Sequence, residues 1–223
     1  MYVQSLETMF ENADYVFDFA LTSFCQSRCK TCPRTNEETG NPEDWLVIRH
    51  VPFDKWKKNT TGLNDTIDIA RIVFCGQTGD PMMHPDITHF VDHAFELTDT
   101  VLINTNGGIR NEKWYTDMGN KYGDSLNIIF AIDGIDHATN WKYREGVDFN
   151  KAWNNMVAHS KTPGSTCWDF LVFEWNWHQI PEVARLAKEL DIFVNFKINT
   201  QPHGLLESRR LPKVKEMICQ STT

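Results

Sequence analysis

The sequence predicts an α/β protein with a parallel sheet, because strand-like and helix-like segments alternate along most of the chain. Six short apolar segments have the length and composition of strands: 15–24, 67–75, 100–104, 126–132, 169–174 and 192–198. Five further segments have helical character: 53–58, 86–97, 112–121, 149–160 and 181–190. These repeats cover residues 15–200, and a short tail follows over 205–223. We therefore expect one domain over residues 1–223.

The helix expected over 86–97 illustrates the pattern. Its apolar residues recur at intervals of three and four: Ile87, Phe90, Val91 and Ala94. That spacing gives one apolar face, which suits packing on a sheet. Pro85 stands just before the helix, where a missing N–H group costs nothing.

Composition agrees with a single globular domain of 223 residues, of which 41% are hydrophobic. No apolar run approaches the roughly 20 residues needed to span a bilayer. The first 14 residues lack the basic and apolar regions of a signal peptide, so a cytoplasmic location is expected. The net charge of −8 argues against a nucleic-acid substrate, which requires a basic surface.

Three cysteines, Cys25, Cys29 and Cys32, stand on one short loop directly after the first predicted strand. Thiolates are the soft ligands that hold iron-sulfur clusters, and three of them leave one corner of such a site without a protein ligand. The alternative is a zinc site completed by a distant ligand such as His50 or His84. Disulfides are disfavoured, because three closely spaced cysteines cannot all pair.

The spacing CxxxCxxC, followed by Pro33 and Arg34, resembles the cluster-binding loop of the radical S-adenosylmethionine (radical SAM) superfamily. The resemblance implies a 4Fe-4S cluster held by the three cysteines, with S-adenosylmethionine as the second cofactor. It also implies an incomplete parallel (β/α)6 barrel, a partial TIM barrel that is open to a large substrate on one side. Chemistry is then expected at the carboxyl ends of the strands.

Motifs at the next strand ends extend this resemblance in the order that the superfamily uses. The turn 78–81, Thr-Gly-Asp-Pro, resembles the Gly-Gly-Glu-Pro turn that holds the amino group of the cofactor's methionine moiety. Asn104 and the following Thr-Asn-Gly resemble the family's third strand end, and Asp133 stands where relatives contact the ribose. The cofactor-binding residues that the resemblance implies are Thr78, Gly79, Asp80, Pro81, Asn104, Asn106, Asp133, Arg144 and Asn176.

The stretch 143–146, Tyr-Arg-Glu-Gly, is similar to a Tyr-Asp-x-x-Arg-Gly stretch of the branch that modifies peptides and proteins. Arg144 is the candidate partner of the cofactor's carboxylate, since a guanidinium matches a carboxylate with two parallel hydrogen bonds. Two positions depart from the pattern. Thr31 replaces the aromatic residue that relatives place before the last loop cysteine, and Asp80 is one methylene shorter than glutamate.

Three other cysteines need an interpretation. Cys75 and Cys167 are expected to be buried strand residues. Cys219, in Met-Ile-Cys, resembles the start of the cysteine-rich extension that holds auxiliary clusters in the peptide-modifying branch. The sequence ends four residues later, so we expect either a minimal form or a second polypeptide that completes it.

The activity that the resemblance implies is reductive cleavage of S-adenosylmethionine to methionine and a 5′-deoxyadenosyl radical, which abstracts hydrogen from a substrate. A peptide or protein side chain is the favoured substrate, and a flavodoxin-like or ferredoxin-like protein is the expected electron donor. Two alternatives stay open: a radical SAM enzyme acting on a small molecule, and a non-catalytic iron-sulfur partner subunit with a decayed cofactor site. No residue is assigned to catalysis on the substrate.

Overall fold

A single parallel sheet of six strands forms the centre of the protein in the computed structural model, which describes residues 15–221. The strands are β1 (Tyr15–Phe19), β2 (Ile69–Phe74), β3 (Val101–Thr105), β4 (Leu126–Ala131), β5 (Ser165–Val172) and β6 (Phe193–Ile198). They lie side by side in sequence order, and every neighbouring pair is parallel. All their carboxyl ends therefore lie at the same edge of the sheet, as the sequence predicts.

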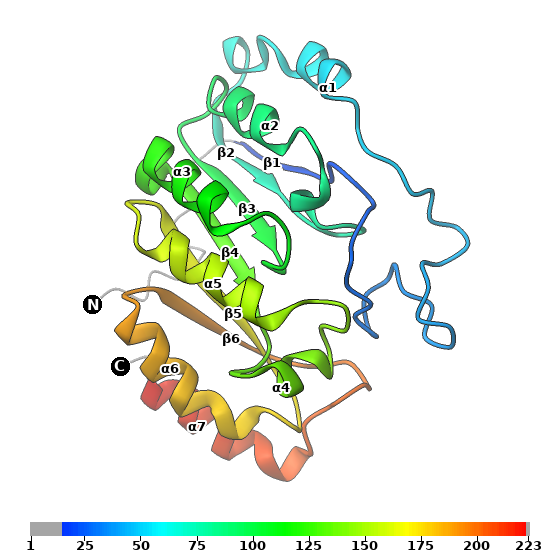
Figure 1. Cartoon of the computed structure of the whole chain (residues 1–223), viewed down its shortest axis with the longest axis vertical. Helices are drawn as coiled ribbons and strands as arrows, with labels where there is room; N and C mark the ends of the chain where they lie inside the picture. Colours follow the sequence, from blue (N-terminus) through cyan, green and yellow to red (C-terminus); the bar gives the residue numbers. More distant parts are fainter. Residues whose placement is uncertain (1–14, 222–223) are drawn as a thin grey trace.

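Helices connect the strands and cover one face of the sheet (Figure 1). They are α1 (Phe53–Thr60), α2 (Ile87–Ala94), α3 (Glu112–Tyr122), α4 (His137–Trp141), α5 (Phe149–Ser160), α6 (Ile180–Glu189) and α7 (Leu211–Ser221). No helix among residues 15–221 is long and apolar enough to cross a membrane.

The core lies between the helices and the sheet, and it explains why the strands alternate in burial. In β4 the buried residues are Leu126, Ile128 and Phe130, whereas the residues between them are half-buried. β5 alternates in the same way, and its buried Trp168 meets Trp153 of α5 with ring centroids 5.4 Å apart. Because successive side chains of a strand point to opposite faces, one face of the sheet packs on the helices and the other stays partly open.

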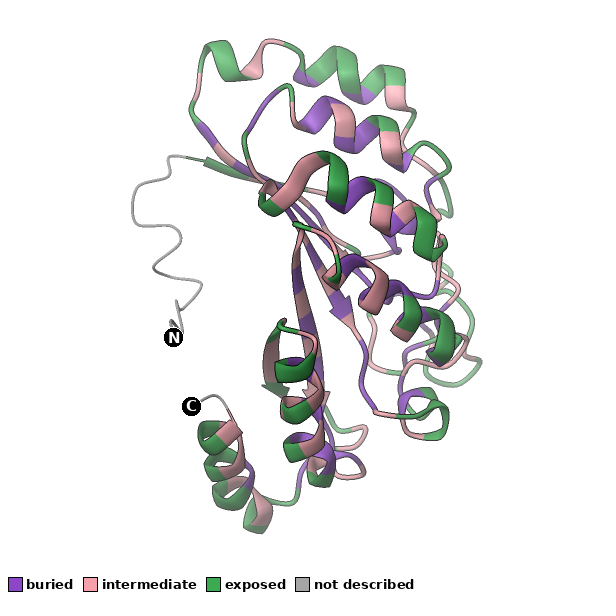
Figure 2. Cartoon of the chain, turned by 60° about the vertical axis from the view of Figure 1, so that its left-hand side comes forward, coloured by how far each residue is buried: buried purple, intermediate pink, exposed green. Residues whose placement is uncertain are grey.

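The sheet does not close into a barrel within the described residues. β1 and β6 are its two edges, and neither pairs with the other. Figure 2 shows the curved, open sheet with the buried helix faces turned toward it. This is the incomplete six-stranded barrel that the sequence predicts.

Strand boundaries differ most from the sequence-based expectation at β1 and β5. β1 ends at Phe19 rather than at residue 24, because the backbone of 21–23 bonds to 49–51 instead, through contacts such as Val51 N to Leu21 O at 2.8 Å. β5 begins at Ser165 and ends at Val172, whereas 169–174 was expected. Its first residues are polar, but they pair in register with β4, and that pairing extends the strand.

Two helices lie outside the five helical segments that the sequence predicts. α4 is only five residues long, and it begins where the Asp136 carboxylate accepts a hydrogen bond from the backbone N–H of Thr139. α7 occupies the expected tail, and its Val214 is fully buried. The tail is therefore a packed helix beside α6, as Figure 1 shows.

Candidate functional site

The three cysteines lie on the loop that leaves β1 at the carboxyl edge of the sheet. Cys29 is buried, and Cys25 and Cys32 are half-buried. The loop is folded on itself, because the backbone N–H of Cys32 donates to the carbonyl of Cys29 at 3.1 Å. Ser27 contacts two sulfurs: its N–H lies 3.4 Å from Cys25 Sγ and its Oγ lies 3.0 Å from Cys29 Sγ.

Arg34 holds the two ends of this loop together. Its side chain is buried, and its guanidinium donates to the carbonyls of Ser23 at 3.2 Å and Ser27 at 3.3 Å. Its Nε donates to the carbonyl of Thr78 at 3.0 Å. One buried cation thus fixes the cysteine loop to the turn 78–81, which the sequence places in the same site.

The turn 78–81 packs directly against the chain that enters the cysteine loop. The backbone N–H of Asp80 donates to the carbonyl of Phe24 at 2.8 Å. A Cβ atom at Gly79 would lie 2.2 Å from the carbonyl oxygen of Thr22, so only glycine fits there. Glycine at this position is required for the close approach of the two backbones.

The Asp80 carboxylate is buried and joins the turn to the end of β3. It accepts hydrogen bonds from the backbone N–H of Met82 and of Asn106 and from the Thr105 hydroxyl, all at 2.8–3.0 Å. Burial raises the pKa of this carboxyl above its ordinary value. The side chain that the sequence assigns to the cofactor's amino group is therefore bonded to the protein itself.

Asn106 extends from β3 toward the cysteine loop. Its amide nitrogen lies 3.7 Å from Cys25 Sγ and 3.3 Å from Gln26 Oε1, and its Oδ1 accepts from Gln26 Nε2 at 2.6 Å. Asn104, also assigned to the cofactor, is half-buried within β3. Of these two residues, Asn106 is the one that reaches a cysteine.

Asp133 and Arg144 form an ion pair beside Cys29. Arg144 Nε lies 2.6 Å from Asp133 Oδ2, and Arg144 Nη1 lies 3.8 Å from Cys29 Sγ. Asp133 is fully buried, and its second oxygen accepts from the backbone N–H of Leu171 at 2.8 Å. Arg144 therefore connects the ends of β4 and β5 to the cysteine loop.

Asn176 is fully buried and has a structural role in this arrangement. Its Nδ2 donates to the carbonyls of Asp133 at 3.0 Å and Leu171 at 2.9 Å, and its Oδ1 accepts from the backbone N–H of Phe173 at 2.6 Å. Both polar atoms of its side-chain amide therefore form hydrogen bonds within the protein. Asn140 assists, since its Oδ1 accepts from the Asp133 N–H at 2.8 Å.

Thr31, which replaces the expected aromatic residue, contacts an aromatic residue from another part of the chain. Its hydroxyl lies 2.8 Å from the hydroxyl of Tyr143. The Tyr143 ring packs on Phe173 at 4.7 Å between centroids, and Phe173 stacks on Trp175 at 4.5 Å. Arg144 lies over the Tyr143 ring, 5.1 Å from its centroid.

The donor set fits an iron-sulfur cluster in its chemistry. Three thiols share one loop, and N–H groups from Ser27, Asn106 and Arg144 lie within 4 Å of their sulfurs. Burial, with the neighbouring Asp80 carboxyl, raises the pKa of the Cys25 thiol to about 12. A bound iron ion would have to displace that proton, as metals do at thiol ligands. No group of three or more His, Cys, Asp or Glu side chains in residues 15–221 already converges on one point as a metal site does.

The remaining candidates lie outside this arrangement. Both ring nitrogens of His84 are bonded to backbone, Nε2 to the Val51 carbonyl at 2.9 Å and Nδ1 to the Asp86 N–H at 3.0 Å. None of the cysteines at the described positions is in a disulfide. Cys75 and Cys167 are half-buried rather than buried, and Cys219 lies exposed on α7.

Known structures share this architecture. Streptococcus suis SuiB matches with a TM-score of 0.68 and 16% sequence identity, over 92% of this chain and 46% of SuiB. The enzyme anSMEcpe with bound AdoMet matches with a TM-score of 0.66 and 14% identity, over 91% of this chain and 55% of that protein. Methylornithine synthase (PylB) matches with a TM-score of 0.57 and 14% identity, over 96% of this chain and 65% of that protein.

The chain has the fold of the radical SAM enzymes. It spans about half the length of SuiB and anSMEcpe. No family model matches the sequence, and no curated protein matches it by sequence. The likeness to the radical SAM fold is therefore recognised from the arrangement of strands and helices and not from overall sequence identity.

Within this radical SAM fold, the structure brings most of the predicted site residues to one edge of the sheet. The cysteine loop, the turn 78–81, Asn106 and the pair Asp133–Arg144 are linked by the contacts above. Sequence reasoning missed Gln26, Thr105, Asn140 and Tyr143 as parts of the site. Gln26, Thr105 and Tyr143 stand within the recognised motifs, so their position carried a signal, whereas Asn140 stands outside those motifs and carried none.

Proposed function

We propose that this chain is a radical SAM enzyme in which Cys25, Cys29 and Cys32 hold a 4Fe-4S cluster. The observation that carries the proposal is the cysteine loop at the carboxyl edge of a six-stranded open parallel sheet, packed on the turn 78–81. When bound, the cluster and S-adenosylmethionine supply reductive carbon-sulfur cleavage and hydrogen abstraction from the substrate.

The protein's own residues have three tasks in this proposal. Arg34 and Gly79 hold the cysteine loop against the turn 78–81, which fixes the position of the three thiolates. Asn106 and Arg144 direct N–H groups at two of the sulfurs, and such donors stabilise negative charge on a ligand. The buried loop contacts exclude water from Cys29.

Cofactor recognition is proposed for the turn 78–81, Asn104, Asn106, Asp133, Arg144 and Asn176. The Asp80 and Asn176 side chains are fully bonded within the protein, so their contribution is to position neighbouring backbone groups. Arg144 is partly exposed, with 19% of its side chain accessible, and can still present a guanidinium nitrogen to a carboxylate. An external flavodoxin-like or ferredoxin-like protein is proposed as the electron donor, and a cytoplasmic location is proposed because the cluster is oxygen-sensitive.

A peptide or protein substrate is proposed from the open face of the sheet. Its half-buried side chains include polar groups, among them Asp169, which pairs with Lys197 and accepts from Asn195 at 3.0 Å. The structures of SuiB with the precursor peptide SuiA and of anSMEcpe with the Cp18Cys peptide have the same fold. The edge strands β1 and β6 do not pair with each other among the described residues, so the sheet stays open and this face leaves room for an extended peptide chain.

A second candidate, a non-catalytic iron-sulfur subunit, draws support from the same site. The Asp80 carboxylate is hydrogen-bonded to the Thr105 hydroxyl, and Asp133 is paired with Arg144. These side chains are therefore bonded within the protein rather than left free for a cofactor. A protein with a decayed cofactor site would show such internal pairing and would still bind iron.

One anaerobic experiment separates the two candidates. The cluster is reconstituted, dithionite and S-adenosylmethionine are added, and 5′-deoxyadenosine is quantified. The variant with Cys25, Cys29 and Cys32 all changed to Ala should lose bound iron and product, whereas Cys219→Ala, at an exposed position on α7, should keep both. Bound iron with no cofactor binding and no product would reject the enzyme and favour the subunit.

A further inference from the structure

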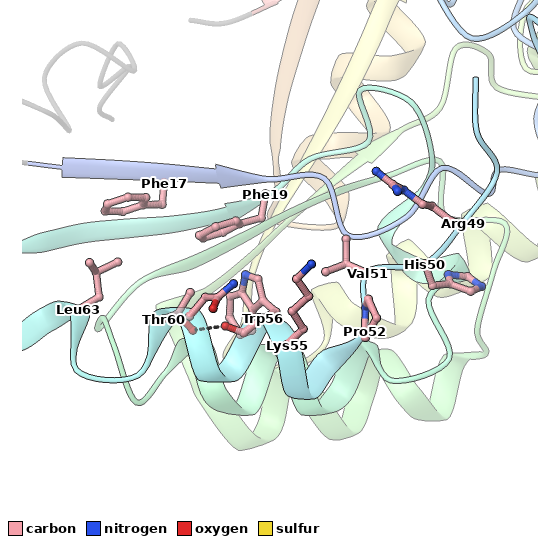
Figure 3. Close-up of a pocket in the computed structure, with 11 residues that line it drawn as sticks. Phe17, Phe19, Arg49, His50, Val51, Pro52, Lys55, Trp56, Thr60 and Leu63 are labelled. Atoms are coloured by element: carbon pink, nitrogen blue, oxygen red, sulfur yellow. Dashed lines mark hydrogen bonds between the residues drawn. The ribbon is translucent and has the colours of Figure 1, made fainter. Parts of the chain in front are cut away.

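A cavity of about 460 Å³ lies between edge strand β1 and helix α1, away from the cysteine loop. Figure 3 shows Phe17 and Phe19 of β1 pointing toward α1, with Leu63 and Trp56 opposite them. The two phenyl rings are stacked with centroids 6.0 Å apart, and Trp56 meets Phe19 edge-on at 5.4 Å. The floor of the cavity is therefore aromatic.

The charged side chains of this cavity are cations, and the Trp56 indole forms part of its wall. Trp56 is only 5% exposed, and its indole Nε1 is buried with no hydrogen-bond partner among residues 15–221. Arg49 and Lys55 also line the cavity, and neither forms an ion pair with any residue between 15 and 221. Of the residues between 15 and 221, no acidic side chain lines it. Within the described residues, the cavity therefore presents positive charge without a counter-charge.

The charge of this cavity contrasts with that of the whole chain, which carries a net charge of −8. Two cations that form no ion pair within residues 15–221 favour an anion, and a carboxylate accepts hydrogen bonds from both. The aromatic floor favours an apolar group beside that carboxylate.

The outer edge of β1 adds a second recognition element. β1 is the first strand of the sheet and pairs only with β2 among the described strands. An edge strand presents unpaired N–H and C=O groups, which an extended peptide can bond as an added strand. Side chains two residues apart on such a peptide point to the same face and would both reach the cavity.

We propose that the groove between β1 and α1 binds an acidic extended peptide, which adds to the edge of β1 and places an apolar side chain and a carboxylate in this cavity. Phe17 and Phe19 contact the apolar side chain. Lys55 and Arg49 bind the carboxylate, and Trp56 lies in the cavity wall beside it. The site is separate from the cysteine loop, and the proposal stands independently of the proposed enzymatic function.

The test follows the indole N–H signal of Trp56 by ¹⁵N NMR of the full chain, assigned with Trp56→Phe. The probe is a capped pentapeptide, Ac-Thr-Phe-Thr-Glu-Thr-amide, whose Phe and Glu share one face of a strand. We expect a saturable shift of the Trp56 signal, at least fivefold weaker binding of the peptide with Gln in place of Glu, and weakening by added salt.

Two lysines on α1 give a matched pair of variants. Lys55→Met should weaken binding of the probe at least fivefold, whereas Lys57→Met, exposed on the same helix but outside the cavity, should leave it unchanged. Both positions are exposed, so both variants should fold. Equal effects of the two variants, or no shift of the Trp56 signal with the peptide, would overturn the proposal.

The binding of free 3-phenylpropionate is compared with that of the peptide. This small molecule carries the phenyl group and the carboxylate but no strand backbone. Binding as tight as that of the peptide would reject strand addition and overturn the peptide proposal in favour of a small-carboxylate site. Clearly weaker binding, with the same Trp56 signal affected, would support it.

Discussion

Arg144 Nε lies 2.6 Å from Asp133 Oδ2, and the other end of the same guanidinium lies 3.8 Å from Cys29 Sγ. The sequence assigns these two residues to different parts of a cofactor, whereas the folded chain pairs them with each other. A fully buried carboxylate is costly without a counter-charge, and Arg144 is the cation that meets it. The pair therefore stabilises the site and also controls how Arg144 is presented to Cys29.

Breaking this pair should destabilise the protein strongly. We expect Asp133→Asn to lower the free energy of unfolding by about 3–5 kcal/mol, because it leaves the Arg144 charge partly buried without its partner. Urea unfolding of both proteins measures the difference. The exposed pair Lys113–Asp117 is the control, and Asp117→Asn should cost less than about 1 kcal/mol. Equal costs at the two positions would contradict the structural role of Asp133.

Gly79 should not tolerate a side chain. An alanine Cβ there would meet the Thr22 carbonyl oxygen at 2.2 Å, so the turn 78–81 must move away from the cysteine loop. We expect Gly79→Ala to lower stability by more than about 2 kcal/mol and to reduce iron bound after reconstitution. Gly62→Ala is the comparison: Gly62 is left-handed with a φ of +78°, its nearest neighbour is the Asp65 side chain at 3.2 Å, and the change should cost only about 1 kcal/mol with normal iron content.

The hydrogen bond between Thr31 and Tyr143 should be measurable as a coupling energy. Tyr143→Phe and Thr31→Val each remove one hydroxyl of the 2.8 Å contact. Each change leaves a partner hydroxyl unpaired, so the single variants should each lose about 1 kcal/mol and the double variant less than their sum. Strict additivity in chemical unfolding would mean that the two hydroxyls do not interact.

His159 should make stability depend on pH. It is fully buried, its Nδ1 lies 2.8 Å from the Thr166 hydroxyl, and burial lowers its pKa from 6.5 to about 4. Between these pH values the unfolded chain binds a proton that the folded chain does not, so stability falls as pH drops from about 6.5 to 4. The loss should reach roughly 3 kcal/mol.

The measurement is unfolding of the iron-free chain at several pH values across that window. His159→Gln is the control, since it cannot titrate and should flatten the slope even if it lowers stability at neutral pH. A slope that persists in His159→Gln would assign the pH dependence to other groups.

The sequence by itself determined that strands alternate with helices along the chain and that the motifs lie at the carboxyl edge of a parallel sheet. Both follow from local properties: apolar segments of strand length alternate with helical ones, and parallel strands place all their carboxyl ends together. The cysteine loop directly follows β1, so its place needed no long-range information. The boundaries of β1 and β5 were less well predicted, because neighbouring backbone decides where pairing ends.

Only the tertiary structure decided what each polar side chain bonds to. The Asp80 carboxylate meets Thr105 and Asn106, Arg144 meets Asp133, and Thr31 meets Tyr143, and each pair is separated by many residues in the sequence. A buried polar group must find a partner wherever the packed chain offers one, and the sequence pattern does not encode that choice. The cavity beside β1 was likewise visible only in the folded chain, because it brings Arg49 and Lys55 together without an acidic side chain from residues 15–221.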